Sequence, residues 1–222
     1  MLRLGMWISR GPRRLDYAFS TEKYSPYSRK PYSKSVKHND MREKALKLLN
    51  EKIVNTNMKK HSLAVGAIMF ALAEHFGENE QDWEVAGILH DIDYEETNKE
   101  LDKHSILGSK YVEEAGFSKE IARAVLTHNV MHGIPAETRF EKALVAADPM
   151  SGLITAAALV LPSKKLADVK SESIVNRFHE KSFAKGANRD CIRVCEQIDL
   201  SLEKFAEISL VAMQSISDQL GL

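Results

Sequence analysis

Apolar residues from Asn39 onward recur at spacings of three and four, and this periodicity is the feature that most constrains the fold. Such spacing places side chains on one face of an α-helix, whereas residues in a strand alternate with a period of two. No convincing alternation of apolar and polar residues bounded by hairpin turns accompanies it. At 222 residues the chain is long enough to bury a core, so we predict one all-α domain over residues 39–222.

Capping residues and helix breakers divide this region into helices. Asp40 and Glu43 have the spacing of a capping box and predict a first helix at about 41–54. Pro149 and Gly152 are expected to kink or divide the helical pattern of residues 138–161. The other predicted helices span about 58–76, 79–89, 104–115, 118–130, 171–181 and 188–198, and a last helix begins after Ser201.

The first 38 residues have a different composition from the rest of the chain. They contain prolines, serines and tyrosines without a sustained apolar period, and nine Lys and Arg against two Asp and Glu. We predict a disordered basic N-terminal extension, for which a transit peptide stays an alternative. Because Lys and Arg (31) balance Asp and Glu (31) over the whole chain, nucleic acid is an expected partner for this tail at most.

Hydropathy and cysteine usage indicate the compartment. No segment approaches the roughly 18 consecutive apolar residues of a membrane span, so we expect a soluble protein without a membrane partner. The two cysteines, Cys191 and Cys195, stand four residues apart in a helical pattern, where a mutual disulfide is geometrically awkward. Two reduced thiols favour a cytoplasmic location.

Histidine and aspartate residues recur at positions where an apolar helix face is expected. His61 shares such a face with Val65, Ile68 and Leu72, at offsets of four, seven and eleven residues. A carboxylate on such a face is costly unless it is paired or bound to a metal ion. The same placement is expected for five further residues: His90, Asp91, His104, His128 and Asp148.

A divalent cation would neutralise this set, because no Lys or Arg occupies the matching apolar positions. Imidazole nitrogens together with carboxylate oxygens suit Mn, Fe, Co, Ni or Zn. The set contains no thiolate, which argues against a structural zinc site of the cysteine type. Three further histidines have polar neighbours and are expected at the surface: His38, His75 and His179.

The order of these residues resembles a known superfamily. His61, the doublet His90-Asp91 in VAGILHDIDY and Asp148 in LVAADPMSG are similar to the H…HD…D pattern of HD-domain metal-dependent phosphohydrolases. The similarity covers about residues 40–222 and is greatest to compact, stand-alone HD-domain proteins described as predicted hydrolases. It implies an HD-type helical fold in which these four residues bind a metal ion and form the catalytic set.

The resemblance also implies a second ion. His104 in KHSILGS and His128 in LTHN resemble the additional histidines of two-metal members, with Asp91 bridging the ions. One or two ions per chain are therefore expected. The second site is expected to be the weaker one, because Asn129 stands where some members have another histidine; His132 is a possible substitute.

The chain departs from the superfamily pattern directly after the doublet. Many members read HDIGK, whereas this chain reads HDIDY. Asp93 and Tyr94 thus replace a glycine and a lysine that could contact phosphate.

The expected activity is hydrolysis of a phosphate ester or anhydride, because a bound cation lowers the pKa of its water and polarises a phosphoryl oxygen. We expect a small, nucleotide-like phosphorylated substrate. Two alternatives stay open: a di-iron oxygenase of the HD type, and a non-catalytic nucleotide-binding or regulatory HD domain. The cations expected to meet the substrate's charge are Arg177, Lys181, Lys185 and Arg189.

Overall fold

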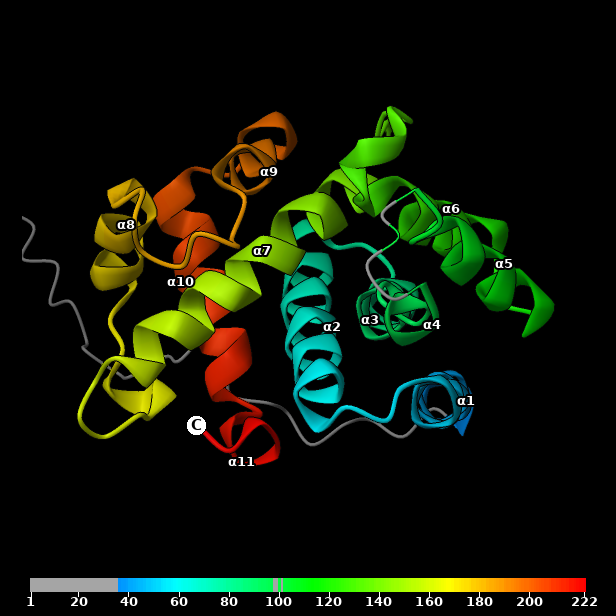
Figure 1. The fold of residues 1–222 in the computed structure, drawn as a ribbon, viewed down its shortest axis with the longest axis horizontal. Coiled ribbons are helices and arrows are strands. Elements are labelled where there is room, and N and C mark those ends of the chain that lie inside the picture. The colour runs from blue at the N-terminus through cyan, green and yellow to red at the C-terminus, as the bar shows by residue number, and fades with distance from the viewer. Residues whose placement is uncertain (1–35, 98–99, 101) are drawn as a thin grey trace, which may run out of the picture. The chain divides into compact units, whose positions relative to one another are not determined.

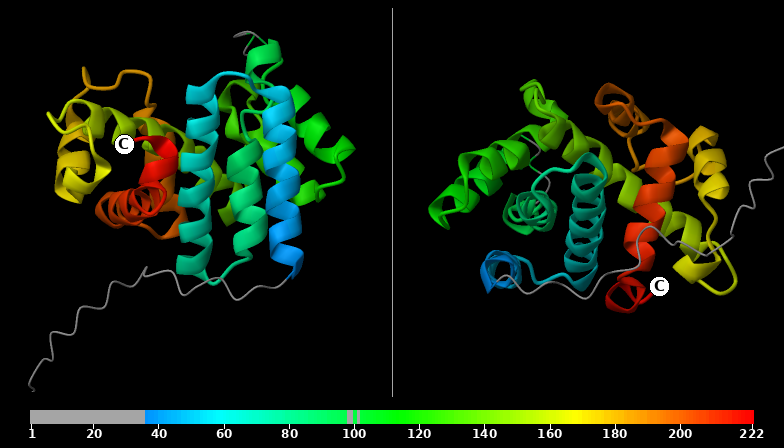
Figure 2. Two further views of the ribbon diagram at one scale, coloured as in Figure 1. Left: turned by 90° about the horizontal axis from the view of Figure 1, so that it is seen from below. Right: turned by 180° about the vertical axis from the view of Figure 1, so that it is seen from behind.

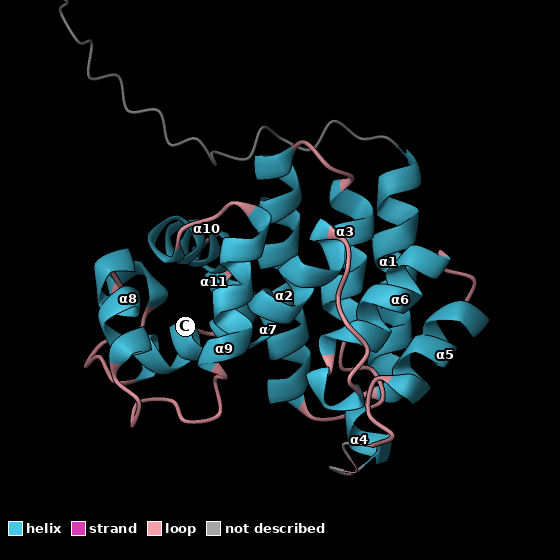
Figure 3. Cartoon of the chain, turned by 90° about the horizontal axis from the view of Figure 1, so that it is seen from above, coloured by secondary structure: helices cyan, strands magenta, loops and turns pink. Residues whose placement is uncertain are grey.

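The computed structural model describes residues 36–97, 100 and 102–222 (Figure 1). Every regular element in this part of the chain is a helix, and no strand occurs in it (Figure 3). The predicted all-α fold is therefore confirmed. Residues 1–35 of the predicted disordered extension lie outside the described residues.

The helices follow one another with short connections. The α-helices are α1 (Val36–Lys52), α2 (Thr56–Phe76), α3 (Glu80–Leu89), α4 (Tyr94–Thr97), α5 (Ile106–Glu114), α6 (Lys119–His128), α7 (Arg139–Leu159), α8 (Ser171–His179), α9 (Arg189–Arg193), α10 (Leu202–Gln214) and α11 (Ser217–Leu220). Three 3₁₀ turns join them: η1 (Val130–His132), η2 (Leu166–Asp168) and η3 (Val194–Ile198).

Helices α1, α2 and α3 lie side by side (Figure 2, left). The α2–α3 contact is very close because two glycines meet there. A Cβ added at Gly87 would lie 2.7 Å from the Cα of Gly66 and 2.8 Å from the carbonyl oxygen of Val65. This close approach sets the distance between α2, which carries His61, and the C-terminal end of α3, where His90 follows.

Helix α7 crosses the domain and packs against α2, α6 and α10 (Figure 1). Among the described residues it is the one helix long and apolar enough to cross a membrane, but 61% of its apolar window is buried inside the domain. It therefore has the properties of a core helix. Asp148 lies in its middle.

Several helix ends are where the sequence predicts them. Asn79 accepts hydrogen bonds from the backbone of Gln81 and Asp82 at the start of α3, and Ser118 and Ser201 cap α6 and α10 in the same way. Gly77 ends α2 with φ 70°, a left-handed conformation that glycine adopts without strain.

Some predicted details of the helices are wrong. Helix α1 begins at Val36, so Asp40 lies inside it rather than at a capping position. Pro149 does not divide α7: it cannot donate to the carbonyl of Val145, yet the helix continues because both of its halves are buried in the core. The predicted helix 188–198 consists of the short helix α9 followed by the 3₁₀ turn η3.

Candidate metal centre

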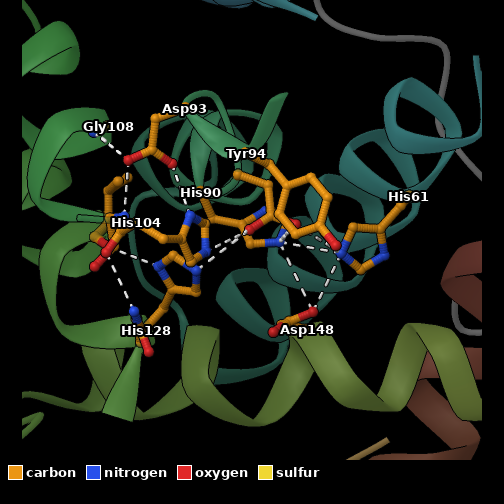
Figure 4. Close-up of polar contacts among 12 residues, drawn as sticks. His61, His90, Asp93, Tyr94, His104, Gly108, His128 and Asp148 are labelled. Carbon is orange, nitrogen blue, oxygen red and sulfur yellow. Dashed lines mark hydrogen bonds and ion pairs between the residues drawn. The ribbon is translucent and has the colours of Figure 1, made fainter. Parts of the chain in front are cut away.

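The structure brings together all six residues expected to bind metal (Figure 4). His61 lies in α2, Asp148 in α7, and His128 is the last residue of α6. His90 and Asp91 follow the last residue of α3. His104 was expected on a helix, but it lies in the turn before α5, because Ser105 adopts φ 70° and α5 begins only at Ile106.

Four of these residues form a first donor set. The Nε2 atom of His61 lies 3.1 Å from Nε2 of His90, 3.1 Å from Oδ1 of Asp148 and 3.4 Å from Oδ2 of Asp91. Nε2 of His90 lies 3.3 Å from the same Asp91 oxygen. Neighbouring ligands held about 2.1 Å from one ion are separated by roughly 3.0–3.4 Å, so the atoms of His61, His90 and Asp91 have the spacing of a metal site. The Oδ1 atom of Asp148 is close to His61 but lies 3.8 Å from Nε2 of His90.

The other carboxylate oxygen of Asp91 faces a second donor set. Its Oδ1 atom lies 3.2 Å from Nε2 of His104 and 3.4 Å from Nε2 of His128. One carboxylate therefore turns one oxygen toward each set, and its orientation suits a bridge between two cations.

The hydrogen bonds at Nδ1 fix which nitrogen each histidine offers. Nδ1 of His90 lies 2.8 Å from the carbonyl oxygen of Gly87, and Nδ1 of His128 lies 2.6 Å from that of Val125. Because a carbonyl oxygen only accepts hydrogen bonds, both Nδ1 atoms carry the hydrogen. Each Nε2 atom therefore keeps a lone pair that can bind a metal ion.

The remaining two histidines are held in the same tautomer by side chains. The Ser151 hydroxyl donates to the carbonyl of Asp148 (2.8 Å) and so accepts from Nδ1 of His61 (3.0 Å). Nδ1 of His104 donates to the buried carboxylate of Asp93 at 2.8 Å. All four Nε2 atoms thus point toward the Asp91 and Asp148 carboxylates.

Electrostatics within the cluster are consistent with a cation site. Burial lowers the pKa of His61, but hydrogen bonds with Asp148 and Asp91 outweigh it and raise that pKa to about 9. Burial would raise the pKa of Asp91, yet the charge of His90 and the hydrogen bonds with the other histidines hold it well below its usual range. Two Nε2 atoms that face each other at 3.1 Å need a positive charge between them, either a proton or a metal ion. The residues therefore fit a divalent cation of the kind that binds imidazole and carboxylate ligands.

The cluster is open on one side. The side chains of Asp148 and His61 are 35% and 23% exposed, whereas those of His90, Asp91, His104 and His128 are at most 10% exposed. Water or a substrate would therefore reach the centre past Asp148 and His61.

A family model for the HD domain matches residues 58–161. This segment contains all six residues of the two donor sets. The chain carries an HD domain. Helices α8 to α11 follow the matched segment and pack on α7 and α2.

Curated relatives of the HD domain are named Ribonuclease Y. The protein from Oleidesulfovibrio alaskensis is 29% identical to this chain over 64% of its residues. The protein from Fusobacterium nucleatum is 27% identical over 73% of this chain. The protein from Rubrobacter xylanophilus is 22% identical over 74% of the chain. The matched regions cover 28% to 32% of these relatives, so the chain spans less than a third of their length. No solved structure matches the chain.

The other described histidine side chains are not directed at the cluster. Nε2 of His132 donates to the backbone carbonyl of His104 at 2.6 Å, so it does not substitute for the histidine replaced by Asn129. The Asn129 amide also donates to the His104 carbonyl, at 3.1 Å. His75 and His179 are exposed as predicted, and the side chain of His38 lies outside the described residues.

The four predicted substrate cations lie on α8, on α9 and between them. Arg177 pairs with Glu180 at 2.6 Å, and Lys181 and Lys185 are exposed. Arg189 differs from the expectation, because its guanidinium donates to six backbone carbonyls of residues 177–187. These bonds close the loop between α8 and α9, so the geometry gives Arg189 a structural role rather than a substrate contact.

Sequence reasoning did not find two polar partners of the ligands. Ser151 binds His61 from the next turn of α7 after Asp148, and the spacing D-x-x-S is the one signal that could have indicated it. Asp93 was noted only as a departure from HDIGK, whereas the structure places its carboxylate against His104.

Proposed function

We propose that this HD domain hydrolyses a phosphate ester or anhydride of a nucleotide or another small phosphorylated metabolite. The observation that carries the proposal is the orientation of Asp91, whose two oxygens face two separate sets of ligand atoms. Two cations about 3.5–4 Å apart, clamping the attacking and leaving oxygens, are typical of phosphate hydrolysis. The HD-domain match and the relatives named Ribonuclease Y support a metal-dependent phosphohydrolase at this coarser level.

Each protein group has a distinct role in this proposal. Divalent ions bound to the cluster would supply a water of lowered pKa and polarise a phosphoryl oxygen. His90 and His128 hold the inner edge of the cluster, while Asp91 spans both donor sets. Asp148 and His61 form the exposed edge, where a phosphate group would enter.

We further propose that a cavity of about 300 Å³, whose lining contains none of the six cluster residues, takes the organic part of the substrate. Its wall includes Thr127, the residue before His128, and Val145, one helical turn before Asp148 on α7. The rest of the lining is mainly apolar, with the polar side chains of Lys142 and Gln197. A lining of this kind suits one compact group with a few polar atoms better than a long polyanion. We place the activity in the cytoplasm, in keeping with the two free thiols of Cys191 and Cys195.

A substrate panel tests the proposed activity. The full chain, loaded with Mn²⁺ or Fe²⁺, is assayed for release of phosphate or nucleotide from p-nitrophenyl phosphate, nucleoside mono-, di- and triphosphates and a short RNA. We expect turnover of at least one small phosphate compound, and its loss by two orders of magnitude or more in Asp91→Asn. The matched control is His75→Ala, which removes an exposed histidine outside the cluster and leaves turnover unchanged.

The competing functions give different results in the same panel. Cleavage of RNA alone would replace the proposed substrate with the one that the names of the relatives indicate. Dioxygen consumption without phosphate release would support the oxygenase alternative, and calorimetric binding of a nucleotide without turnover would support a regulatory domain. Either of the last two results contradicts the proposed hydrolase.

A further inference from the structure

Asp93 is a fully buried carboxylate two residues after the bridging Asp91. Burial of a carboxylate is costly unless hydrogen bonds replace its hydration. Here Oδ1 accepts from Nδ1 of His104 at 2.8 Å, and Oδ2 accepts from the backbone N–H groups of Ser105 (2.8 Å) and Gly108 (2.7 Å). Figure 4 shows this carboxylate between Gly108 and His104. The other ring nitrogen of His104, Nε2, lies 3.2 Å from Oδ1 of Asp91.

The turn before α5 is shaped around this carboxylate. Ser105 adopts φ 70°, a strained conformation for a residue with a Cβ, and this conformation aims its N–H at Asp93. The Ser105 hydroxyl donates to the carbonyl of Leu126 at 2.9 Å, which holds the turn against α6. A Cβ at Gly108 would lie 3.2 Å from Cγ of Asp93, so glycine leaves the room that the carboxylate needs.

His104 is the one histidine of the cluster whose Nδ1 is held by a carboxylate. The Nδ1 atoms of His90 and His128 donate to backbone carbonyls, and the Nδ1 atom of His61 donates to a hydroxyl. A carboxylate partner fixes the ring and makes the opposite nitrogen a stronger metal ligand than a neutral partner does.

We propose that Asp93 is a positioning residue that directs Nε2 of His104 at Asp91 and thereby strengthens the second cation site. This inference rests on the proposed two-ion centre. It also reverses the expectation that the second site is weak, since the departure from HDIGK supplies the carboxylate that compensates for Asn129.

The test is a calorimetric Mn²⁺ titration of the full chain and its Asp93→Asn variant after removal of bound metal. An asparagine cannot accept from both His104 and the two N–H groups, because its NH₂ group must face one of these donors. We expect affinity for the second equivalent of Mn²⁺ to fall at least tenfold, while the first equivalent binds as in the original protein. The matched control is Glu141→Gln, which removes another buried carboxylate, one that pairs with Arg123. This control should leave the affinity for both equivalents of Mn²⁺ unchanged.

A second measurement does not depend on metal. In the metal-stripped protein near pH 10, ¹⁵N chemical shifts should show His104 with hydrogen on Nδ1 only, and Asp93→Asn should mix the two tautomers. If Asp93→Asn does not fold, Gly108→Ala serves instead, because its Cβ displaces the carboxylate by a few tenths of an ångström. Gly108→Ala should weaken binding of the second Mn²⁺ equivalent, but less strongly than Asp93→Asn does.

The outcomes separate the two proposals. Equal loss of both equivalents, or unchanged binding and an unchanged tautomer, would show that Asp93 is structural only and overturn the inference. A protein that never binds more than one equivalent would overturn the two-ion centre, and with it the role of Asp93 in a second site. A changed His104 tautomer would then still establish that Asp93 orients the ring.

Discussion

The Ser151 hydroxyl connects two residues of the first donor set. It accepts from Nδ1 of His61 and donates to the backbone carbonyl of Asp148. It therefore fixes the ring that lies at the exposed edge of the centre. Residues of this kind typically change metal affinity by 10- to 100-fold when they are replaced.

Ser151→Ala should weaken the first ion about tenfold while the chain stays folded, because His61 loses the partner that selects its tautomer. Mn²⁺ titration measures this loss, and circular dichroism checks the fold. Ser209→Ala is the matched control: Ser209 is also fully buried, and its hydroxyl has no hydrogen-bond partner among the described residues. Equal Mn²⁺ affinity in the two variants would contradict the role given to Ser151.

The residues of the cluster could be predicted from sequence as candidate ligands, whereas their hydrogen-bond partners could not. His61, His90, Asp91 and Asp148 stand out because polar groups on apolar helix faces need a common explanation. The partners of the ligands depend on tertiary positions. The contact of Asp93 with Ser105 and Gly108 requires a left-handed turn that no residue type in KHSILGS announces.

At the level of elements, the contact between α2 and α3 determines where the first donor set forms. Gly66 and Gly87 let the two backbones approach so closely that a Cβ at Gly87 would lie 2.7 Å from the neighbouring Cα. His90 follows α3 three residues after Gly87, so any change in this contact moves a ligand.

Gly87→Ala should destabilise the domain by about 1–3 kcal/mol, because the backbone atoms that it meets can move only together with their helix. Thermal denaturation measures the destabilisation, and Mn²⁺ titration should show weaker binding at the first set. Gly152→Ala is the control, since a Cβ there meets nothing within 4 Å. It should stabilise α7 by about 0.5–1 kcal/mol. A Gly87→Ala variant as stable as the parent protein would contradict the close approach.

The presence of the main helices could be predicted because capping residues and apolar spacing are local signals in the sequence. Asn79, Ser118 and Ser201 cap the helices that they were expected to cap. The errors at Asp40 and Pro149 have a common reason: packing on neighbouring helices outweighs a local start or stop signal.

At the level of the whole molecule, the cluster couples stability to pH. In the metal-stripped protein the pKa values of His61 and His104 are both raised to about 9. The pKa of His104 is raised because its hydrogen bonds with Asp91 and Asp93 outweigh the effect of burial. A raised pKa contributes stability that is complete below the ordinary value near 6.5 and is lost as the pH rises through about 9.

The melting temperature in EDTA should therefore fall by roughly 5–10 °C between pH 6.5 and pH 9. Added Mn²⁺ should raise it more at pH 8 than at pH 6, because the ligands must lose protons to bind a cation. Differential scanning calorimetry measures both effects. A melting temperature in EDTA that rises over this range would show that the histidines are not held as cations by the carboxylates.

The number of Mn²⁺ ions bound per chain is the most direct test of the two-ion centre. Equilibrium dialysis followed by elemental analysis should give about two ions for the original protein. One bound ion should remain in His128→Ala, because this variant leaves the first donor set intact. One bound ion should also remain in His61→Ala, because this variant leaves the second donor set intact. At most one ion per chain at saturating Mn²⁺ in the original protein would contradict the two-ion centre.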